Sequence, residues 1–271
     1  MTASTIVAPT EAAKPSAKDE EGISALKTEI AASSDEFLST LPEHFDKQLV
    51  NEQVNTIISD DQWILRLLVA RKYNLKKTVS LFQEQVYWRT KWQPWNIKLS
   101  DISTPIQSGA WRLCGKTRDG APICNYKLKY WNPDEYGLDE YIRFVAYMLD
   151  LFVSEMTPGG PSQFVCLFDL EGFTVSLIRQ NVREMIRKLI YVAQAQHPER
   201  LRQVFLLNAP WGFSTAWTLI SPLLDAKTAS KAFFITGPDF SKSLDERAGI
   251  APSVLSEYYG GKHAEYPFPH E

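Results

Sequence analysis

Residues 203–224, QVFLLNAPWGFSTAWTLISPLL, contain no charged side chain, and their interpretation decides the fold. The run is about as long as a membrane-spanning helix, but two prolines, a glycine and an asparagine interrupt it and its apolar period changes partway. We therefore interpret residues 204–208 as a buried strand, 209–212 as a turn and 213–223 as a helix. A surface helix without charge is unusual and needs an explanation.

The composition is that of a globular protein. Of the 271 residues 44% are hydrophobic, which is enough for a core, and the formal net charge of −3 provides no basic field for a nucleic acid. The N-terminus lacks a signal-peptide pattern and a myristoylation glycine, and the C-terminus lacks a prenylation box, so we expect a cytoplasmic protein. Three cysteines and four scattered histidines have no disulfide or metal-ligand spacing, so we expect neither a metal nor a cofactor.

Helical periodicity dominates the first part of the chain. Residues 1–20 have the composition of a disordered tail, and a short helix is expected around residues 23–30. Asp60 is a good N-cap for a clear amphipathic helix, and residues 76–91 carry apolar side chains at helical spacing. We assign residues 21–95 to an N-terminal helical cap.

Short apolar runs alternate with helical stretches after residue 120. This alternation predicts an α/β fold with a mostly parallel sheet and crossover helices, which we assign to residues 96–271. Strands are expected at residues 122–129, 164–169, 204–208 and 232–236, and helices at residues 138–156, 182–197 and 213–223.

Residues 197–231, HPERLRQVFLLNAPWGFSTAWTLISPLLDAKTASK, resemble a known pattern. It is the P-E-R, N-A-P-x-x-F, P-x-L-D and T-x-x-K series of the CRAL-TRIO lipid-binding domain family, in particular of its phosphatidylinositol transfer branch. The resemblance spans roughly residues 55–265 and implies a helical cap and a lipid pocket closed by a helical lid. It includes LRLLVARKYNLKKTVSLFQEQVYWR at 65–89, DGAPI at 119–123, FDLEGF at 168–173 and YYGGK at 258–262.

The resemblance also implies a site for the phosphatidylinositol head group. Such a head group needs cations for its phosphodiester and a carboxylate for its ring hydroxyls. The positions that carry this role in relatives that bind phosphatidylinositol are matched here by Arg71, Lys72, Glu199, Thr228 and Lys231. The alternative is structural: the first two residues as a solvated helix C-terminus, and Glu199 with Lys231 as an ion pair or plain surface charges.

Side chains of one strand are candidates for the pocket floor. Phe164, Cys166 and Phe168 share one face by the period of two, and filling an ordinary core explains them as well as lining a pocket. The founding phosphatidylcholine/phosphatidylinositol exchangers have hydroxyl residues at the positions of Phe164 and Cys166. Phenylalanine cannot replace a hydroxyl at a choline lipid's phosphate, and a thiol does so weakly. We therefore expect little phosphatidylcholine binding and a more apolar second ligand.

The uncharged helix is the predicted lid. Its inner face would cover acyl chains, and its outer face, including Trp217 or Phe213, would meet a bilayer without the desolvation cost of charged groups. Gly212 and Pro222 are the predicted hinges. The alternative is a helix buried under the N-terminal cap. The complete set of predicted lid residues is Phe213, Trp217, Ile220 and Leu224.

These features together predict a lipid transfer protein without a catalytic site. It would extract phosphatidylinositol into an apolar cavity and move it between membranes, or present it to a lipid kinase, as a monomer with transient peripheral membrane contact. The alternative classes are a carrier of a sterol, retinoid-like or tocopherol-like ligand and a lipid-sensing adaptor.

A serine hydrolase is a further alternative. Residues 212–216, GFSTA, approach the G-x-S-x-G nucleophile elbow, and His263 follows in hydrolase order. Against it, residues 209–211 separate this segment from the predicted strand end, and alanine replaces the last glycine.

Overall fold

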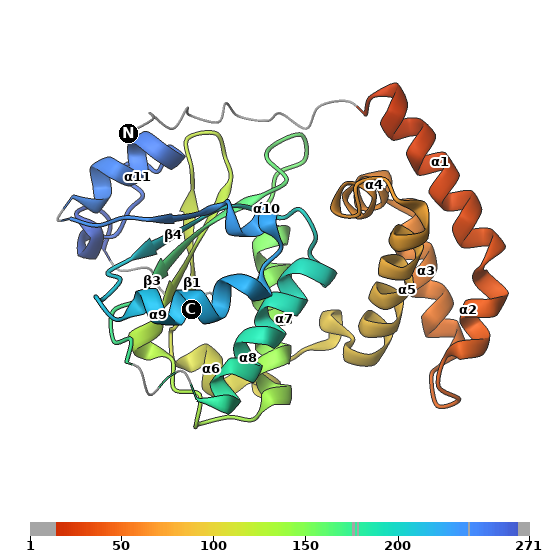
Figure 1. Ribbon diagram of the computed structural model, residues 1–271, viewed down its shortest axis with the longest axis horizontal. Coiled ribbons are helices and arrows are strands. Elements are labelled where there is room, and N and C mark those ends of the chain that lie inside the picture. The colour runs from red at the N-terminus through yellow and green to blue at the C-terminus, as the bar shows by residue number, and fades with distance from the viewer. Residues whose placement is uncertain (1–14, 175–176, 178, 238, 265–271) are drawn as a thin grey trace. The chain divides into compact units, whose positions relative to one another are not determined.

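The computed structural model describes residues 15–174, 177, 179–237 and 239–264 (Figure 1). Contacts within the chain divide it into two compact units, and each is described by itself. The helical unit comprises Ala13–Asn96 and Tyr191–Glu199, and the sheet unit comprises Ile97–Ile190 and Arg200–Glu271.

In the described residues of the helical unit, five α-helices surround an aliphatic core. Ile23, Leu26 and Ile30 are buried, as their helical spacing predicted. Asp60 caps its helix as expected, because its carboxylate accepts a hydrogen bond from the Trp63 backbone N–H at 2.9 Å. The helices are α1 (Ala17–Ala32), α2 (Ser34–Thr40), α3 (Lys47–Ser59), α4 (Asp61–Ala70) and α5 (Leu75–Trp92).

Helix α1 begins earlier than the composition predicted. Ser16 and Asp19 form a capping box, in which each side chain accepts a hydrogen bond from the other residue's backbone N–H. The predicted tail of residues 1–20 is therefore wrong at residues 17–20. Residues 1–14 lie outside the described part of the chain.

The segment before the fourth strand packs within the helical unit. The side-chain amide of Gln85 on α5 donates to the backbone carbonyl of Ala195 at 2.6 Å, and Ala195 belongs to the aliphatic core. The helix expected to end at His197 is regular only as far as Tyr191 and continues as one π-helical turn, Val192–Gln196.

The sheet unit contains five strands in the order β1-β2-β3-β4-β5. Strand β1 pairs antiparallel with β2, and the other neighbours are parallel, which confirms the predicted mostly parallel α/β sheet. The strands are β1 (Trp111–Lys116), β2 (Pro122–Lys127), β3 (Phe164–Asp169), β4 (Leu201–Leu207) and β5 (Ala232–Phe234). The α-helices are α6 (Ser103–Gln107), α7 (Leu138–Ser154), α8 (Gln180–Tyr191), α9 (Phe213–Ile220), α10 (Ala226–Ala229) and α11 (Phe240–Ala248).

The two faces of the sheet are covered by different helices. Figure 1 shows α7, α8 and α9 on one side of the strands and α11 on the other. Val165 and Leu167 of β3 pack with Leu244 of α11 in a closed hydrophobic core. Phe164, the neighbour of Val165, instead contacts Phe152 of α7, with ring centroids 5.7 Å apart. We call the side covered by α7, α8 and α9 the floor face and the α11 side the core face.

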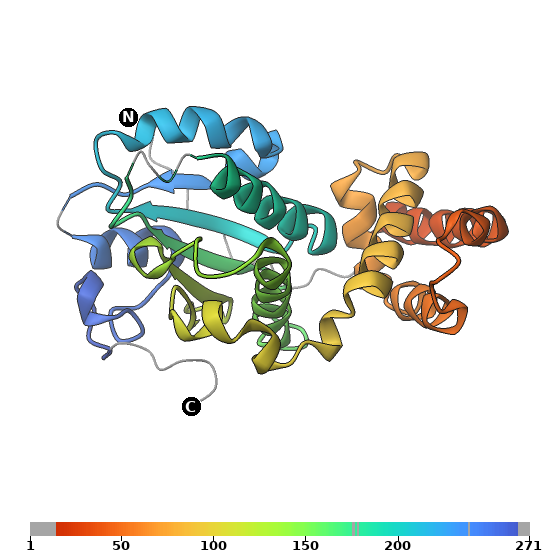
Figure 2. The same ribbon diagram turned by 90° about the horizontal axis from the view of Figure 1, so that it is seen from below.

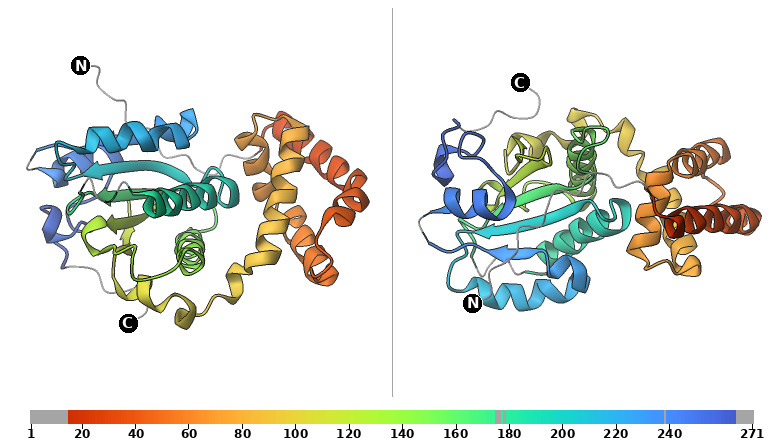
Figure 3. Two further views of the ribbon diagram at one scale, coloured as in Figure 1. Left: turned by 60° about the horizontal axis from the view of Figure 1, so that its bottom comes forward. Right: turned by 90° about the horizontal axis from the view of Figure 1, so that it is seen from above.

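Helix α9 lies beside the edge strand β5 (Figures 2 and 3). Its Phe213 and Trp217 rings contact the Phe234 ring at centroid distances of 6.2 and 5.5 Å. The helix expected over residues 213–223 ends at Ile220 and continues as a 3₁₀ turn, Ser221–Leu223. None of the described helices is long and apolar enough to cross a membrane.

Candidate functional site

Two predicted head-group residues of the sheet unit belong to one polar cluster. The Thr228 hydroxyl donates to an Asp225 carboxylate oxygen at 2.6 Å, and the Thr228 backbone N–H donates to the other oxygen at 2.9 Å. The Lys231 backbone N–H donates to the Thr228 carbonyl, and the Lys231 ammonium group donates to the carbonyl of Leu201, where β4 begins. The T-x-x-K turn thus fixes Thr228 and Lys231 near the amino ends of β4 and β5.

Asp225 is a member of this cluster that the sequence interpretation assigned no role. Burial acts to raise the pKa of its carboxyl group, but hydrogen bonds from Thr228 and attraction to Lys231 outweigh burial and lower that pKa. The cluster therefore combines a hydroxyl group, a carboxylate and an ammonium group, which are the groups that recognise a phosphate flanked by hydroxyls.

The other three head-group candidates lie in the helical unit. Arg71 is the C-cap of α4, and Lys72 after it is exposed and has a left-handed backbone with φ of 52°. Glu199 is half-buried and also left-handed, with φ of 61°. Such a conformation is uncommon for residues other than glycine and is enriched at functional sites. The grouping of all five residues around one head group stays a prediction, because they are divided between two units.

The predicted floor residues do share one face of β3. Phe164 and Cys166 are buried, and Phe168 is half-buried with its ring stacked on Tyr126 of β2 at 4.7 Å and 14°. Cys166 lies opposite Cys124 of β2 in the parallel register. Phe168 is thus the one member of this set at which the floor face is partly open.

Burial differs between the two faces of the sheet. On the core face the side chains of Leu167, Phe205 and Leu244 are at most 1% exposed. On the floor face, apolar side chains of α8 and α9 are only half-buried. They are Ile186, Leu189 and Ile190 on α8 and Trp217 and Ile220 on α9, with Leu223 and Leu224 just after. Phe233, Phe240 and Val254 are partly buried against the core face as well, so the floor face is the side with the larger set of half-buried apolar side chains.

The predicted lid is uncharged and apolar, but its exposed residues differ from those expected. Phe213 is only 4% exposed and packs edge-on against Phe173, with ring centroids 5.2 Å apart, so it cannot be the outward contact. Trp217 is half-buried against Phe234. Sequence reasoning did not identify Trp211, which is 99% exposed, or Leu219, which is 48% exposed. Trp211 lies in the quoted motif, but nothing in the sequence indicates that its side chain is exposed.

The predicted hinges flank the lid helix. A side chain added at Gly212 would meet nothing within 4 Å, and Pro222 lies in the 3₁₀ turn after α9. Asn208, the first residue after β4, has a left-handed backbone with φ of 51°. The hinge function of Gly212 and Pro222 stays a prediction.

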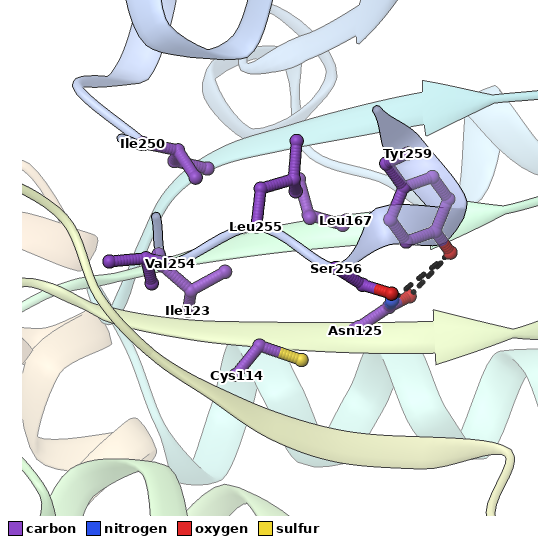
Figure 4. A pocket seen from close by; sticks show the side chains of 9 residues that line it. All are labelled: Cys114, Ile123, Asn125, Leu167, Ile250, Val254, Leu255, Ser256 and Tyr259. Carbon is purple, nitrogen blue, oxygen red and sulfur yellow. Dashed lines mark hydrogen bonds between the residues drawn. The ribbon is translucent and has the colours of Figure 1, made fainter. Parts of the chain in front are cut away.

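A crevice lies on the core face of the sheet, away from the predicted floor (Figure 4). Its lining includes Cys114, Asn125 and Tyr259, and the Asn125 amide and the Tyr259 hydroxyl are hydrogen-bonded across it at 3.0 Å. It has no room for a water-sized molecule. This crevice is a gap in packing and does not accommodate a ligand.

The hydrolase alternative has no support from the local geometry. Ser214 lies inside the first turn of α9, and residues 208–212 separate that helix from the end of β4. A nucleophile elbow instead places its serine directly at the strand end. Within the described residues, no three His, Cys, Asp or Glu side chains gather as a metal site.

A family model for the CRAL/TRIO domain matches residues 106–261. Among curated proteins, "Protein real-time" of Aedes aegypti is 30% identical over 213 residues, which cover 72% of this chain and 32% of that protein. "SEC14 cytosolic factor" of Candida glabrata is 29% identical over 221 residues, 75% of this chain and 71% of that protein. "Phosphatidylinositol/phosphatidylcholine transfer protein SFH9" of Arabidopsis thaliana is 25% identical over 241 residues, 80% of this chain and 40% of that protein.

The chain spans about a third of the length of the two mosquito relatives named "Protein real-time". Among solved structures, "Crystal structure of Sfh5" has a TM-score of 0.66 at 17% identity and covers 94% of this chain and 91% of its own. That likeness concerns the fold alone, whereas the family model covers more than half of the sequence and includes the sheet, the floor residues and the uncharged helix. The chain therefore belongs to the CRAL/TRIO domain family.

Proposed function

We propose that this chain is a non-catalytic carrier that binds phosphatidylinositol on the floor face of its sheet unit and moves it between membranes. The observation that carries the proposal is the half-burial of apolar side chains on α8 and α9, on the side of the sheet opposite the buried cluster of the core face. Family membership and the name of the Arabidopsis relative support a phospholipid as the ligand.

The energetics of transfer require an apolar shelter. Moving two chains of roughly 16 carbons from a bilayer into water costs on the order of 20 kcal/mol, at about 0.8 kcal/mol per CH₂. Hydrogen bonds to a head group cannot offset a cost of this size. The half-buried apolar side chains beside α8 and α9 supply the kind of surface that acyl chains would cover.

The polar cluster around Lys231 would hold the head group. The ammonium group would bind the phosphodiester, and Thr228 and Asp225 would bind ring hydroxyls. Arg71, Lys72 and Glu199 are proposed to contribute a second set of charges from the helical unit. Helix α9 would open as a lid during exchange, with the protein acting in the cytoplasm and touching membranes transiently.

Vesicle-to-vesicle transfer of labelled phosphatidylinositol tests this function. We expect the wild type to transfer it and Lys231→Ala to lose most of that activity, because removal of a charged partner of the phosphate costs about 2–5 kcal/mol. The matched control is Lys242→Ala, an exposed lysine on α11 beyond the core face. Arg71→Ala tests the helical-unit residues separately.

Melting temperatures of all variants must be measured with the transfer rates, because Lys231 also binds the Leu201 carbonyl. Absence of transfer by the wild type would refute the carrier function. Equal transfer by Lys231→Ala and Lys242→Ala would refute only the head-group assignment.

A further inference from the structure

The connection between β2 and α7 carries two buried polar groups that have no hydrogen-bond partner. They are the indole N–H of Trp131 and the hydroxyl of Tyr136. Each side chain belongs to a residue that is only 8% exposed. A buried donor without an acceptor is costly, so such groups are rare in folded proteins and call for an explanation.

The two groups belong to one aromatic cluster. The ring of Tyr141 on α7 contacts both of them, with ring centroids 6.0 Å from Trp131 and 6.1 Å from Tyr136. Trp131 also contacts the Tyr126 ring edge-on at 6.5 Å, and Tyr126 is stacked on Phe168. The cluster therefore connects directly to the partly open end of the floor.

The cluster is held in place by its own loop. The Trp131 backbone N–H donates to the Leu128 carbonyl at 3.0 Å, and the Asn132 side chain donates to the Glu135 carboxylate at 2.9 Å. One turn thus fixes the backbone before Trp131, and a second fixes it between Trp131 and Tyr136. These turns order the loop, so fraying does not account for the two buried polar groups.

The chemistry of the cluster selects uncharged groups. Burial, assisted by the nearby Tyr141, raises the pKa of Tyr136 far above its usual value, and the Trp131 indole N–H beside its hydroxyl acts in the opposite direction. Burial likewise raises the pKa of Tyr126. The phenols therefore stay neutral, and no side chain of the cluster carries a charge that would bind a phosphate.

An indole N–H only donates, whereas a phenol both donates and accepts. One ligand oxygen that accepts from Trp131 and pairs with Tyr136 satisfies both residues. We propose that Trp131 and Tyr136 form a hydrogen-bonding subsite for a neutral oxygen, a hydroxyl or a carbonyl, of an apolar ligand lying on the floor face. This inference rests on the proposed carrier function and assigns a chemical class to its second ligand or to the ester region of its first.

Ligand pairs that differ only in the candidate oxygens test the subsite. The purified protein is loaded from vesicles that contain either cholesterol or cholest-5-ene, which lacks only the hydroxyl. A second pair is diacyl phosphatidylinositol and its dialkyl ether, which lacks the carbonyls. The loading ratio within each pair is then compared between the wild type and the variants, because the partition of each ligand into the vesicles cancels in that comparison.

We expect Tyr136→Phe and Trp131→Phe each to lower the ratio of one pair by about tenfold, which is the loss of one hydrogen bond. A fall in the cholesterol ratio assigns the oxygen to a sterol-type ligand, and a fall in the phospholipid ratio assigns it to an ester. The control is Tyr130→Phe, an exposed tyrosine of the same connection that should change neither ratio.

The conservative variant Tyr136→Phe should leave the melting temperature of the protein unchanged or slightly higher, because it removes an unsatisfied buried hydroxyl. Unchanged ratios in both variants would overturn the subsite and leave trapped water as the partner of these groups. Phosphatidylinositol transfer is also measured for the wild-type protein of the same preparation. Normal transfer with unchanged ratios refutes the subsite alone, and absent transfer refutes the carrier function.

Discussion

The carboxylate of Asp169 accepts a hydrogen bond from the side-chain amide of Asn208, with 2.9 Å between Oδ1 and Nδ2. Asp169 ends β3, and Asn208 is the first residue after β4, where the chain turns toward α9. The other carboxylate oxygen accepts from the Tyr259 hydroxyl at 2.9 Å. One fully buried carboxylate therefore joins the floor strand, the approach to the predicted lid and the C-terminal segment.

The variant Asp169→Asn should be strongly destabilised. Its amide would present N–H groups to donors that now face an ionised oxygen, and a hydrogen bond to a charged group contributes about 1.5–3 kcal/mol. We expect the free energy of unfolding to fall by at least that amount, measured by denaturant titration at neutral pH.

Asp245→Asn is the matched control for Asp169→Asn. Asp245 binds Arg118 through two hydrogen bonds at 2.9 and 2.8 Å, but the Arg118 side chain is 60% exposed. An exposed pair contributes about 0–1 kcal/mol, so this variant should unfold near the wild type. Equal stabilities of the two variants would show that the buried carboxylate is not a structural junction.

The Asp119–Arg202 pair predicts a loss of stability in acid. The carboxylate lies 2.6 Å from the Arg202 guanidinium, and both side chains are mostly buried. Burial acts to raise the pKa of Asp119, but hydrogen bonds from Thr117 and Arg202 outweigh it, so this pKa is lowered. A lowered pKa stabilises the fold above the unfolded value of about 3.9, and this contribution is lost as the pH falls through the folded value.

Asp119→Asn should therefore reduce the free energy of unfolding at pH 7 by about 1.5–3 kcal/mol. The difference from the wild type should begin to shrink below about pH 4, where the carboxyl group of the unfolded chain becomes protonated, and it should vanish as the pH falls through the lowered folded value. Urea titrations of both proteins at a series of pH values measure this difference in the free energy of unfolding. A difference that is constant from pH 7 to pH 3 would contradict the role of this ionised group.

Local patterns in the sequence were sufficient for the central elements of the fold. Strand β3 matches the expected residues 164–169, because it is a continuous apolar run. Strand β4 begins at Leu201, earlier than expected, because the polar Arg202 and Gln203 interrupt the apolar pattern from which the strand was predicted. The strand includes Arg202 because its guanidinium group donates a hydrogen bond to Asp119. Strand β1 was not predicted, because its sequence WRLCGK mixes charges with a glycine and its pairing depends on β2.

The candidate site could be predicted only where it is local. Thr228 and Lys231 are three residues apart, so one turn brings them together. The aromatic cluster is different, because it reaches the floor residue Phe168 only through Tyr126, when β2 and β3 pair. No spacing rule identifies a buried group that lacks a partner, and the side chains exposed beside the lid depend on packing in the same way.

The floor residues predict a limited response to added hydroxyls. Cys166→Thr changes the side-chain volume little, and the wild type should transfer phosphatidylcholine weakly. Phe164→Ser removes a ring that is 6% exposed and contacts Phe152 at 5.7 Å. We expect Cys166→Thr to raise phosphatidylcholine transfer. The double variant Phe164→Ser/Cys166→Thr should also lose stability, because a large cavity of this type costs about 3–5 kcal/mol.

Vesicle assays with labelled phosphatidylcholine, paired with thermal unfolding, measure both effects, and Cys114→Thr on the core face is the control. Transfer of phosphatidylcholine by the wild type as fast as phosphatidylinositol would refute the role given to Phe164 and Cys166.

The exposed side chains around α9 predict how the protein meets a membrane. Trp211 is 99% exposed immediately before the helix, and Leu219 is 48% exposed on it. An indole ring enters the interfacial region of a bilayer favourably, and no charged group on α9 opposes insertion. Trp211→Ala should therefore weaken liposome binding and slow transfer, whereas Trp95→Ala, which removes an exposed indole from the helical unit, should change neither.

A fluorophore on a cysteine placed at residue 219 reports docking directly. Labelling at that position is selective because Cys114, Cys124 and Cys166 are all buried. Its emission should shift to the blue when liposomes are added to the wild-type background, and less so in Trp211→Ala. An unshifted emission in both proteins would exclude this surface as the membrane contact.

Opening of the lid is tested by tying α9 to β5. The rings of Trp217 and Phe234 contact at 5.5 Å, so cysteines at these two positions are close enough to be crosslinked by a short thiol-specific reagent. If α9 must move for lipid to leave, the crosslinked protein should retain preloaded lipid and stop transferring it, while each single-cysteine variant treated with the same reagent should remain active. Normal transfer by the crosslinked protein would mean that α9 is a fixed wall of the unit and that lipid enters elsewhere.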